Sequence, residues 1–288
     1  ESWDKGDSQG PVSIADIEVN DMLRARLCAA RPGYGWLSEE SPDDAARQTP
    51  ARTFIIDPID GTRAFLAGEH SFAHSLALAE GGEIIAAVVH LPMRQETYTA
   101  SRGGGAFLNG VPIGVGAAPL SPKARILTSR ASLNAEHWAH GAPAFARHFR
   151  PSLAWRMCLV AAGHFDAMIT LRPTWEWDVA AGGVQHTLRL TGRAGRVQNE
   201  QRVFRAHFFG FTLIGRGTGD VVIPNVATVF HVDVAAGALI VAEAGGAVLT
   251  RSLALPRFNN PDPRLNGLLA GPKPLVAELG SALKPAGQ

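Results

Sequence analysis

Cysteine is scarce in this chain of 288 residues, which holds only Cys28 and Cys158, far apart in sequence. Two cysteines cannot build a disulfide framework, and no Cys-x-x-Cys zinc or redox motif is present. The first ten residues are polar, hold three acidic side chains and do not resemble a signal peptide. These features favour a reducing compartment, and we expect a cytoplasmic protein.

An excess of charge of one sign is also missing, since 27 basic and 26 acidic residues leave a formal net charge of +1. Such a balance offers no strong basic field for nucleic acid or for an anionic membrane surface. Apolar runs fall well short of the roughly 20 residues that a membrane-spanning helix needs. The hydrophobic fraction of 46% is ordinary for a globular protein, so a small molecule is the expected partner.

The hydrophobic periodicity predicts alternating strands and helices without a regular parallel rhythm. This order indicates a layered α/β or α+β fold. We expect helices over residues 13–30, 153–162 and 234–244, strands over residues 53–56, 71–79, 83–90, 95–100 and 167–171, and a hairpin turn at Asn109-Gly110.

The segment Asp57-Pro-Ile-Asp60-Gly-Thr62 carries the strongest chemical signal. Two carboxylates this close repel each other unless a cation lies between them. Hard cations such as Mg²⁺ prefer these oxygen donors, and the Ile59 carbonyl can add another. Gly61 and Thr62 then open a segment whose N–H groups can bind a phosphate. Taken alone, however, such a string is usually just a turn.

Two further acidic positions strengthen the metal hypothesis. Glu39 lies in Ser-Glu-Glu-Ser after an apolar run, and Asp178 or Asp233 lies where a predicted strand meets a helix. Separated acids at strand ends are what a multi-metal site for phosphoryl transfer requires. Taken alone, each cluster is better explained as a set of solvated loop acids.

A short direct repeat marks an unusual organisation, because Asp-Val-Ala-Ala-Gly occurs at residues 178–182 and again at 233–237. Removing residues 183–237 joins the two flanks into a smooth strand, turn and helix. We therefore interpret the chain as one domain over residues 1–288 with an insertion at 183–237. The repeat at both flanks favours an insertion at the level of the gene, and a surface insertion that the fold tolerates is the alternative.

Beyond these patterns, the sequence resembles the inositol monophosphatase family of Mg²⁺-dependent, lithium-sensitive phosphatases. The resemblance implies an αβαβα sandwich, and it implies that a long N-terminal helix usual in the family is absent here. The matching segments are Lys-Gly-Asp (residues 5–7), Pro-Val-Ser-Ile-Ala-Asp (11–16), Trp-Leu-Ser-Glu-Glu-Ser (36–41), Phe-Ile-Ile-Asp-Pro-Ile-Asp-Gly-Thr-Arg-Ala-Phe (54–65), Gly-Gly-Gly-Ala-Phe-Leu-Asn-Gly (103–110) and Asp-Val-Ala-Ala-Gly-Ala-Leu-Ile-Val-Ala-Glu-Ala-Gly-Gly (233–246).

The resemblance also implies a role for each site residue. Glu39, Asp57 and the Ile59 carbonyl would hold a first Mg²⁺. Asp57, Asp60 and the aspartate of the repeat would hold a second, and a weaker third would lie by Glu39. Thr62, assisted by Asp16, would orient and deprotonate the attacking water, while the N–H groups of Gly61 and Thr62 would bind the phosphate.

Either copy of the repeat could supply the last aspartate. Asp178 keeps a preceding Trp, whereas the sequence after Asp233 keeps the whole apolar helix pattern. A ligand at a helix start needs that helix packed into the core, so we slightly favour Asp233.

Within the family, the sequence looks most like the bacterial 3′(2′),5′-bisphosphate nucleotidases, which implies 3′-phosphoadenosine 5′-phosphate as substrate. The inositol enzymes carry an acid seven residues before the motif aspartate, where this chain has Leu171 or Val226. Inositol 1-phosphate and histidinol phosphate remain alternative substrates, and a homodimer is expected from the family. A metal-binding homologue impaired in catalysis by residues 183–237 is the alternative of another class.

Overall fold

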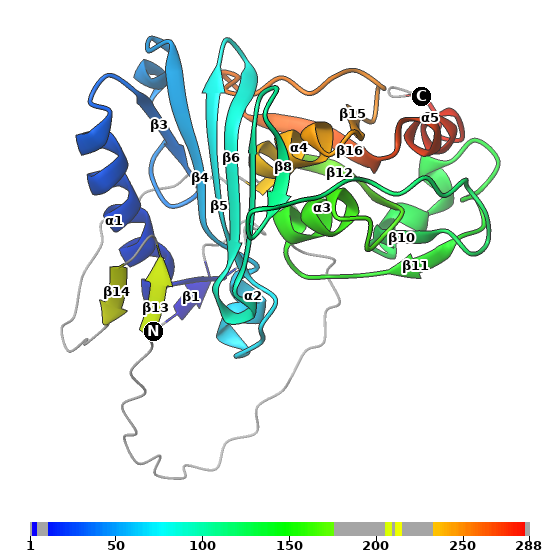
Figure 1. The fold of residues 1–288 in the computed structure, drawn as a ribbon. Helices are drawn as coiled ribbons and strands as arrows, with labels where there is room; N and C mark the ends of the chain where they lie inside the picture. Colours follow the sequence, from blue (N-terminus) through cyan, green and yellow to red (C-terminus); the bar gives the residue numbers. More distant parts are fainter. Residues whose placement is uncertain (1, 5–10, 176–204, 209–210, 215–232, 286–288) are drawn as a thin grey trace.

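Five layers of helix and sheet build the molecule, in the order helix, sheet, helices, sheet, helix (Figure 1). The computed structural model describes residues 2–4, 11–175, 205–208, 211–214 and 233–285. The predicted layered α/β sandwich is therefore confirmed. Within the described residues, no helix combines the length and the apolarity needed to span a membrane.

The first sheet has seven strands in the order β3-β4-β5-β6-β7-β8-β9. β3 runs parallel to β4, and every other neighbouring pair is antiparallel. The predicted hairpin turn is confirmed between β8 and β9, where Asn109 and Gly110 both have positive φ. The strands are β3 (Gly35–Ser38), β4 (Arg52–Asp60), β5 (Ala73–Glu80), β6 (Glu83–Leu91), β7 (Glu96–Ser101), β8 (Gly105–Leu108) and β9 (Val111–Pro112).

The second sheet has five strands in the order β11-β10-β12-β16-β15, and two small antiparallel pairs, β1 with β2 and β13 with β14, stand apart from both sheets. These strands are β10 (Arg125–Thr128), β11 (Ala146–His148), β12 (Ala167–Trp175), β15 (Ala247–Thr250), β16 (Arg264–Gly271), β1 (Ser2–Asp4), β2 (Pro11–Ser13), β13 (Arg205–Phe208) and β14 (Phe211–Ile214).

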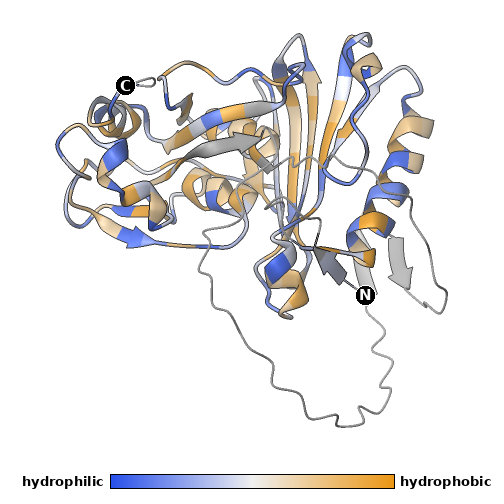
Figure 2. Ribbon diagram, turned by 180° about the vertical axis from the view of Figure 1, so that it is seen from behind, coloured by the Kyte–Doolittle hydropathy of each residue, from blue (hydrophilic) through white to orange (hydrophobic). Residues whose placement is uncertain are grey.

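Helix α1 (Ile14–Ala30) covers the outer face of the first sheet. Its start is fixed by a capping box, in which the Asp16 carboxylate accepts hydrogen bonds from both the N–H and the hydroxyl of Ser13. One apolar stripe of the helix, with Val19 and Leu23, packs on Ile56 of β4 and Leu76 of β5. Figure 2 shows the corresponding alternation of hydrophilic and hydrophobic colours around this helix.

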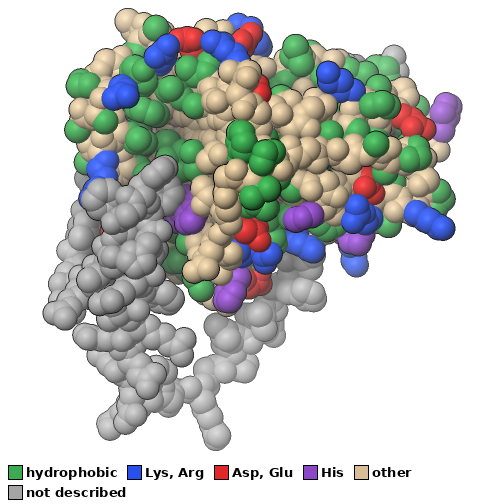
Figure 3. Space-filling model, viewed as in Figure 1, with side chains coloured by type: hydrophobic (Ala, Val, Ile, Leu, Met, Phe, Trp, Pro, Cys, Tyr) green, Lys and Arg blue, Asp and Glu red, His purple; other side chains and the backbone are tan. Residues whose placement is uncertain are grey.

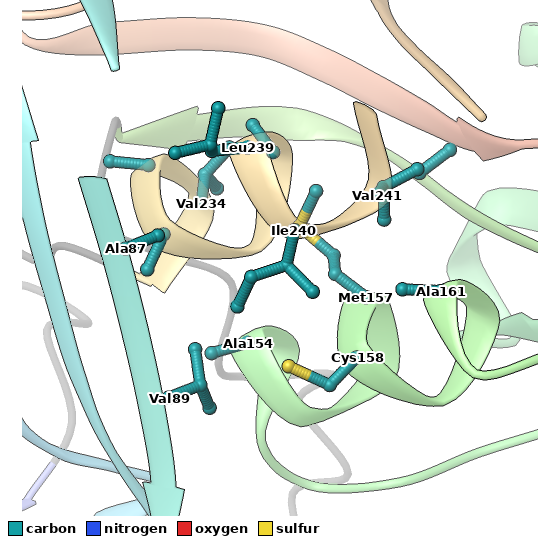
Figure 4. Close-up of a cluster of buried hydrophobic side chains, with 14 of the residues drawn as sticks. Ala87, Val89, Ala154, Met157, Cys158, Ala161, Val234, Leu239, Ile240 and Val241 are labelled. Atoms are coloured by element: carbon teal, nitrogen blue, oxygen red, sulfur yellow. The ribbon is translucent and has the colours of Figure 1, made fainter. Parts of the chain in front are cut away.

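Helices α3 (Leu153–Ala161) and α4 (Asp233–Glu243) form the middle layer, between the two sheets. Because both faces of this layer are covered, these helices are apolar nearly all round. Figure 4 shows Ile240 and Val234 of α4 facing Met157 and Ala154 of α3 across the core. The helices approach closely at Gly237, where a Cβ atom would lie 2.6 Å from the Met157 sulfur.

The last layer is helix α5 (Lys273–Ser281), whose residues Leu275, Val276 and Leu279 pack on the second sheet. Among the shorter elements, α2 (Thr62–Leu66) follows β4 directly. Single 3₁₀ turns complete the described chain at η1 (Ala45–Gln48), η2 (Pro92–Arg94), η3 (Ala131–Leu133) and η4 (Ala135–His137).

Two predicted strand ends prove too early. The strand expected over residues 53–56 continues to Asp60, because a register shift lets β4 pass through Pro58 without losing its partner β5. The strand expected to end at Leu171 continues to Trp175 along β16. Of the proposed insertion at residues 183–237, the last five residues form the first part of α4.

Candidate active site

The site is built where β3 ends beside β4, which continues to Asp60. Ser38 pairs with Ile56, and the next N–H, that of Glu39, donates to the Ile56 carbonyl at 3.2 Å. Glu39 therefore lies beside Asp57. The parallel pairing thus brings together two acidic segments that are separated in sequence by the 3₁₀ turn η1.

All three carboxylates predicted from these segments are buried, with exposed fractions of 4% for Glu39, 1% for Asp57 and 3% for Asp60. Carboxylates are seldom buried to this extent unless hydrogen bonds or cations compensate the lost hydration. Their burial rules out the interpretation that they are solvated loop acids.

A bulge in β4 separates the two aspartates. Asp57 pairs with Ser75 and Asp60 with Ala73 on β5, so that Pro58 and Ile59 oppose the single residue His74. Gly61 follows with a φ of +95°, a left-handed conformation that favours glycine, and it caps the start of α2. The bulge and this glycine turn the chain out of the sheet at the site.

Asp60 is tied to the middle layer through the start of α3. Its carboxylate accepts hydrogen bonds from the Ser152 hydroxyl, from the Leu153 N–H at 3.2 Å and from the Ala154 N–H at 2.8 Å. A negative charge at a helix N-terminus is stabilised by the unpaired N–H groups there. Asp60 therefore connects the site to the helix that packs on α4.

Thr62 and Asp16 lie together, as the resemblance implies. The Thr62 Oγ1 atom is 3.2 Å from Asp16 Oδ1 and 3.1 Å from the Ile59 carbonyl oxygen. The other carboxylate oxygen of Asp16 accepts the two hydrogen bonds from Ser13. Asp16 thus has a fixed orientation and one oxygen atom directed at the threonine hydroxyl.

The loop that carries Glu39 is held by a polar network that the sequence patterns did not reveal. Ser38 Oγ donates to Asn20 Oδ1 at 2.6 Å, and Asn20 Nδ2 donates to Ser41 Oγ at 3.1 Å. Trp36 Nε1 also donates to Ser41 Oγ at 3.2 Å. Sequence reasoning missed Asn20, and also Ser152, whose position just before an apolar helix is a recognisable N-cap signal.

Two other titratable groups near the site are neutral. Burial lowers the pKa of His74 to about 4. Burial, with a smaller contribution from the charge of Asp60, raises the pKa of the Cys158 thiol. A protonated, buried thiol is a poor nucleophile, so the site offers no cysteine chemistry.

The donor set suits a hard cation, since it consists of carboxylate oxygens and the carbonyl of Ile59. In the described part of the chain, no three His, Cys, Asp or Glu side chains form a ready metal cluster. Asp178 lies outside the described residues, and Asp233 is described only as the first residue of α4. Lys5 and Asp7 also lie outside the described residues.

Comparison with known proteins decides the relationship. The model of the inositol monophosphatase family matches residues 2–184, which is more than half of the chain. The chain belongs to the inositol monophosphatase family. It is thus a phosphatase of a metal-dependent family, acting on phosphate esters.

Curated relatives carry several names within this family. An inositol-1-monophosphatase of Rhizobium meliloti is 39% identical over 64% of this chain and 70% of its own length. A 3′-phosphoadenosine 5′-phosphate phosphatase of Mycobacterium leprae is 36% identical over 62% of this chain and 69% of its own. A 3′(2′),5′-bisphosphate nucleotidase of Aggregatibacter actinomycetemcomitans is 30% identical over 60% and 68%.

Solved structures agree with the fold. The extragenic suppressor protein suhB of Bartonella henselae superposes with a TM-score of 0.66 at 25% identity, covering 99% of this chain and 88% of its own. An inositol monophosphatase of Thermotoga maritima gives the same TM-score at 22% identity, with 97% and 85% covered. The αβαβα architecture of this family member is thus shown by its relatives as well.

The relatives' names correct one preference of the sequence analysis. Nucleotidase names occur among the relatives, but the inositol monophosphatase of Rhizobium meliloti is more similar to this chain than either of those nucleotidases. The inositol alternative is therefore better supported than the nucleotidase branch. The nucleotidase resemblance rests on two short segments, residues 34–40 and 60–65, which are too few to separate the branches of one family.

Proposed function

We propose that this family member hydrolyses a small anionic phosphate ester with Mg²⁺ at the ends of β3 and β4. The observation that carries the proposal is the burial of Glu39, Asp57 and Asp60 beside the Thr62–Asp16 pair. Three buried carboxylates with a hydroxyl and a carboxylate beside them match the donors and the base that metal-assisted phosphoryl transfer needs. No broad field of one charge covers the face seen in Figure 3, which fits a small substrate.

The residues divide into those that hold cations and those that act on substrate and water. Glu39, Asp57, Asp60, the Ile59 carbonyl and the repeat aspartate, Asp233 or Asp178, would hold two or three Mg²⁺ ions. When bound, these ions lower the pKa of water and neutralise charge on the phosphoryl group.

Thr62 orients the attacking water through its hydroxyl, whose hydrogen is directed at Asp16 or at the Ile59 carbonyl. The Thr62 hydroxyl gives its hydrogen to Asp16 Oδ1 as it takes one from the attacking water, so the proton ends on Asp16. The two hydrogen bonds from Ser13 to the other oxygen hold Asp16 in the orientation that this transfer needs. The N–H groups of Gly61 and Thr62, where the chain leaves β4, bind the phosphate oxygens.

For the substrate, we propose inositol 1-phosphate, on the strength of the relatives' names. The 3′-phosphate of 3′-phosphoadenosine 5′-phosphate is the second candidate, and a specific residue favours it. If Asp178 is the metal ligand, the position seven residues before it is Leu171, which lies in β12 with an exposed fraction of 1% and cannot bind an inositol hydroxyl. If Asp233 is the ligand, the position is Val226, which is apolar too and lies outside the described residues.

A direct turnover comparison tests both the reaction and the substrate. Purified protein is given Mg²⁺ and, separately, inositol 1-phosphate, 3′-phosphoadenosine 5′-phosphate and histidinol phosphate, and phosphate release is measured with and without lithium. We expect the highest kcat/KM on inositol 1-phosphate and inhibition by lithium. Faster release from the nucleotide would assign the second substrate, and no release from any of the three esters would contradict the proposed function.

Deleting residues 183–237 tests the proposal that they are an insertion. The junction keeps the α4 sequence unchanged, because residues 178–182 and 233–237 are identical and Ala238 follows in both cases. β12 ends at Trp175, so the deletion places one aspartate three residues after that strand. We expect the shortened protein to fold and to release phosphate at least about ten times faster, a gain of about 1.4 kcal/mol in the barrier.

The full-length variants Asp178→Asn and Asp233→Asn are the matched comparison, since only the aspartate that holds Mg²⁺ should abolish turnover. Equal activity of the full and shortened proteins would show that the segment is a passive loop. A shortened protein that folds but is less active would show that the segment contributes to catalysis.

A further inference from the structure

His74 occupies a special position in the first sheet, directly opposite the bulge of β4. On β5 it is the single residue between Ser75 and Ala73, while β4 has Pro58 and Ile59 between their partners Asp57 and Asp60. A bulge interrupts the regular ladder of backbone hydrogen bonds, so its carbonyl groups need other donors.

A side chain bonds the first carbonyl group of the bulge, and a hydroxyl that also faces Asp16 lies near the second. The imidazole Nδ1 of His74 is hydrogen-bonded to the Pro58 carbonyl, and the Thr62 hydroxyl lies 3.1 Å from the Ile59 carbonyl. A carbonyl oxygen has two lone pairs, so the Ile59 oxygen keeps acceptor capacity for a cation. The hydrogen bond from His74 is made with the Pro58 carbonyl. It therefore fixes the peptide unit between Pro58 and Ile59, just before the Ile59 carbonyl.

The chemistry of this contact defines the tautomer of His74. A carbonyl oxygen only accepts hydrogen bonds, so Nδ1 must carry a hydrogen. The ring is buried, and burial keeps it neutral with a pKa of about 4, which leaves Nε2 without a proton. The ring also stacks on His90 of β6, with centroids 6.2 Å apart and planes inclined by 17°, which fixes its orientation.

We propose that His74, through the hydrogen on its Nδ1 atom, is a positioning residue that sets the spacing of Asp57 and Asp60 by holding the Pro58 carbonyl. This inference rests on the proposed function, in which both aspartates hold Mg²⁺. Some residues orient the metal ligands without touching the metal themselves. Replacing such a residue typically lowers metal affinity or activity by 10- to 100-fold.

Two variants separate the hydrogen bond from the packing of the ring. His74→Phe keeps a flat ring on His90 but removes the donor, whereas His74→Asn keeps an N–H donor at the same distance from the backbone as Nδ1. Binding of Mn²⁺ alone is measured by titration calorimetry, and Tm is measured beside it. We expect His74→Phe to weaken Mn²⁺ binding about tenfold, and His74→Asn to bind more nearly like the wild type.

His90→Phe is the matched control, because His90 lies in the same stack and bonds Thr97 through its Nδ1 atom, not the bulge. It should leave Mn²⁺ binding unchanged. Equal affinity of His74→Phe and the wild type would overturn the inference, and so would equal weakening by His74→Phe and His90→Phe. Absence of Mn²⁺ binding in the wild type would instead count against the proposed function.

The tautomer is tested without any substitution. Long-range ¹H–¹⁵N correlation spectra of the wild-type protein should show a protonated Nδ1 and an unprotonated Nε2 for His74 at neutral pH, with the resonance assigned from the His74→Asn spectrum. The opposite tautomer would overturn the inference even if His74→Phe failed to fold.

Discussion

Replacing Asp57 by asparagine should reduce phosphate release by at least about a hundredfold, because this buried carboxylate is shared between both proposed cations. Replacing residues that merely orient metal ligands lowers metal affinity or activity by 10- to 100-fold. Replacing a direct ligand should lower them by at least as much. Asparagine is nearly isosteric, so the fold should persist. The measurement is kcat/KM at saturating Mg²⁺, combined with the rise in Tm that Mg²⁺ produces by binding the folded state.

Glu278→Gln is the matched control for this variant. Glu278 lies exposed on α5, in the outer layer on the second sheet, and the change removes the same charge away from the described site residues. It should keep both the turnover and the Mg²⁺-dependent rise in Tm. If Asp57→Asn retained both properties as well, Asp57 would not be a metal ligand.

Truncating Ile240 to alanine should destabilise the protein by about 2–5 kcal/mol, the usual cost of removing a large buried aliphatic side chain. Ile240 is fully buried in α4, and Figure 4 shows it between Met157 of α3 and the strand that carries Val89. The loss of stability has two parts. The removed methyl and methylene groups no longer gain free energy by leaving water, and they leave a cavity that the packed helices cannot close. Urea unfolding followed by circular dichroism measures the free energy of unfolding.

Leu255→Ala is the control for the core variant, since Leu255 is 75% exposed. An exposed leucine should change the free energy of unfolding by less than about 0.5 kcal/mol. A loss from Ile240→Ala as small as this would show that the middle layer does not support the fold.

The local chemistry of the chain was predictable because it depends on neighbours in sequence. The helix predicted over residues 13–30 is α1, and Asn109-Gly110 predicted the hairpin between β8 and β9. The string from Asp57 to Thr62 predicted an acidic turn with a hydroxyl. Here the backbone geometry alone brings the interacting groups within reach.

By contrast, the support of the site came from distant segments, and no sequence pattern paired those segments with the site residues. Asn20 holds the loop after β3, and Ser152 with the start of α3 binds Asp60 across 92 residues. His74 alternates along β5 like any strand residue, and only the bulge opposite shows what its imidazole contacts. Such partners depend on strand register and on how the layers pack.

The sequence by itself therefore determined the family, the layered fold and the acidic residues that the site would use, because these depend on residue type and on local order. Only the tertiary structure decided that the three acids are buried and that β4 bulges between Asp57 and Asp60. It also decided that Asp60 is bonded to α3. Burial and long-range contacts follow from which surfaces pack against each other, and no local pattern encodes that choice.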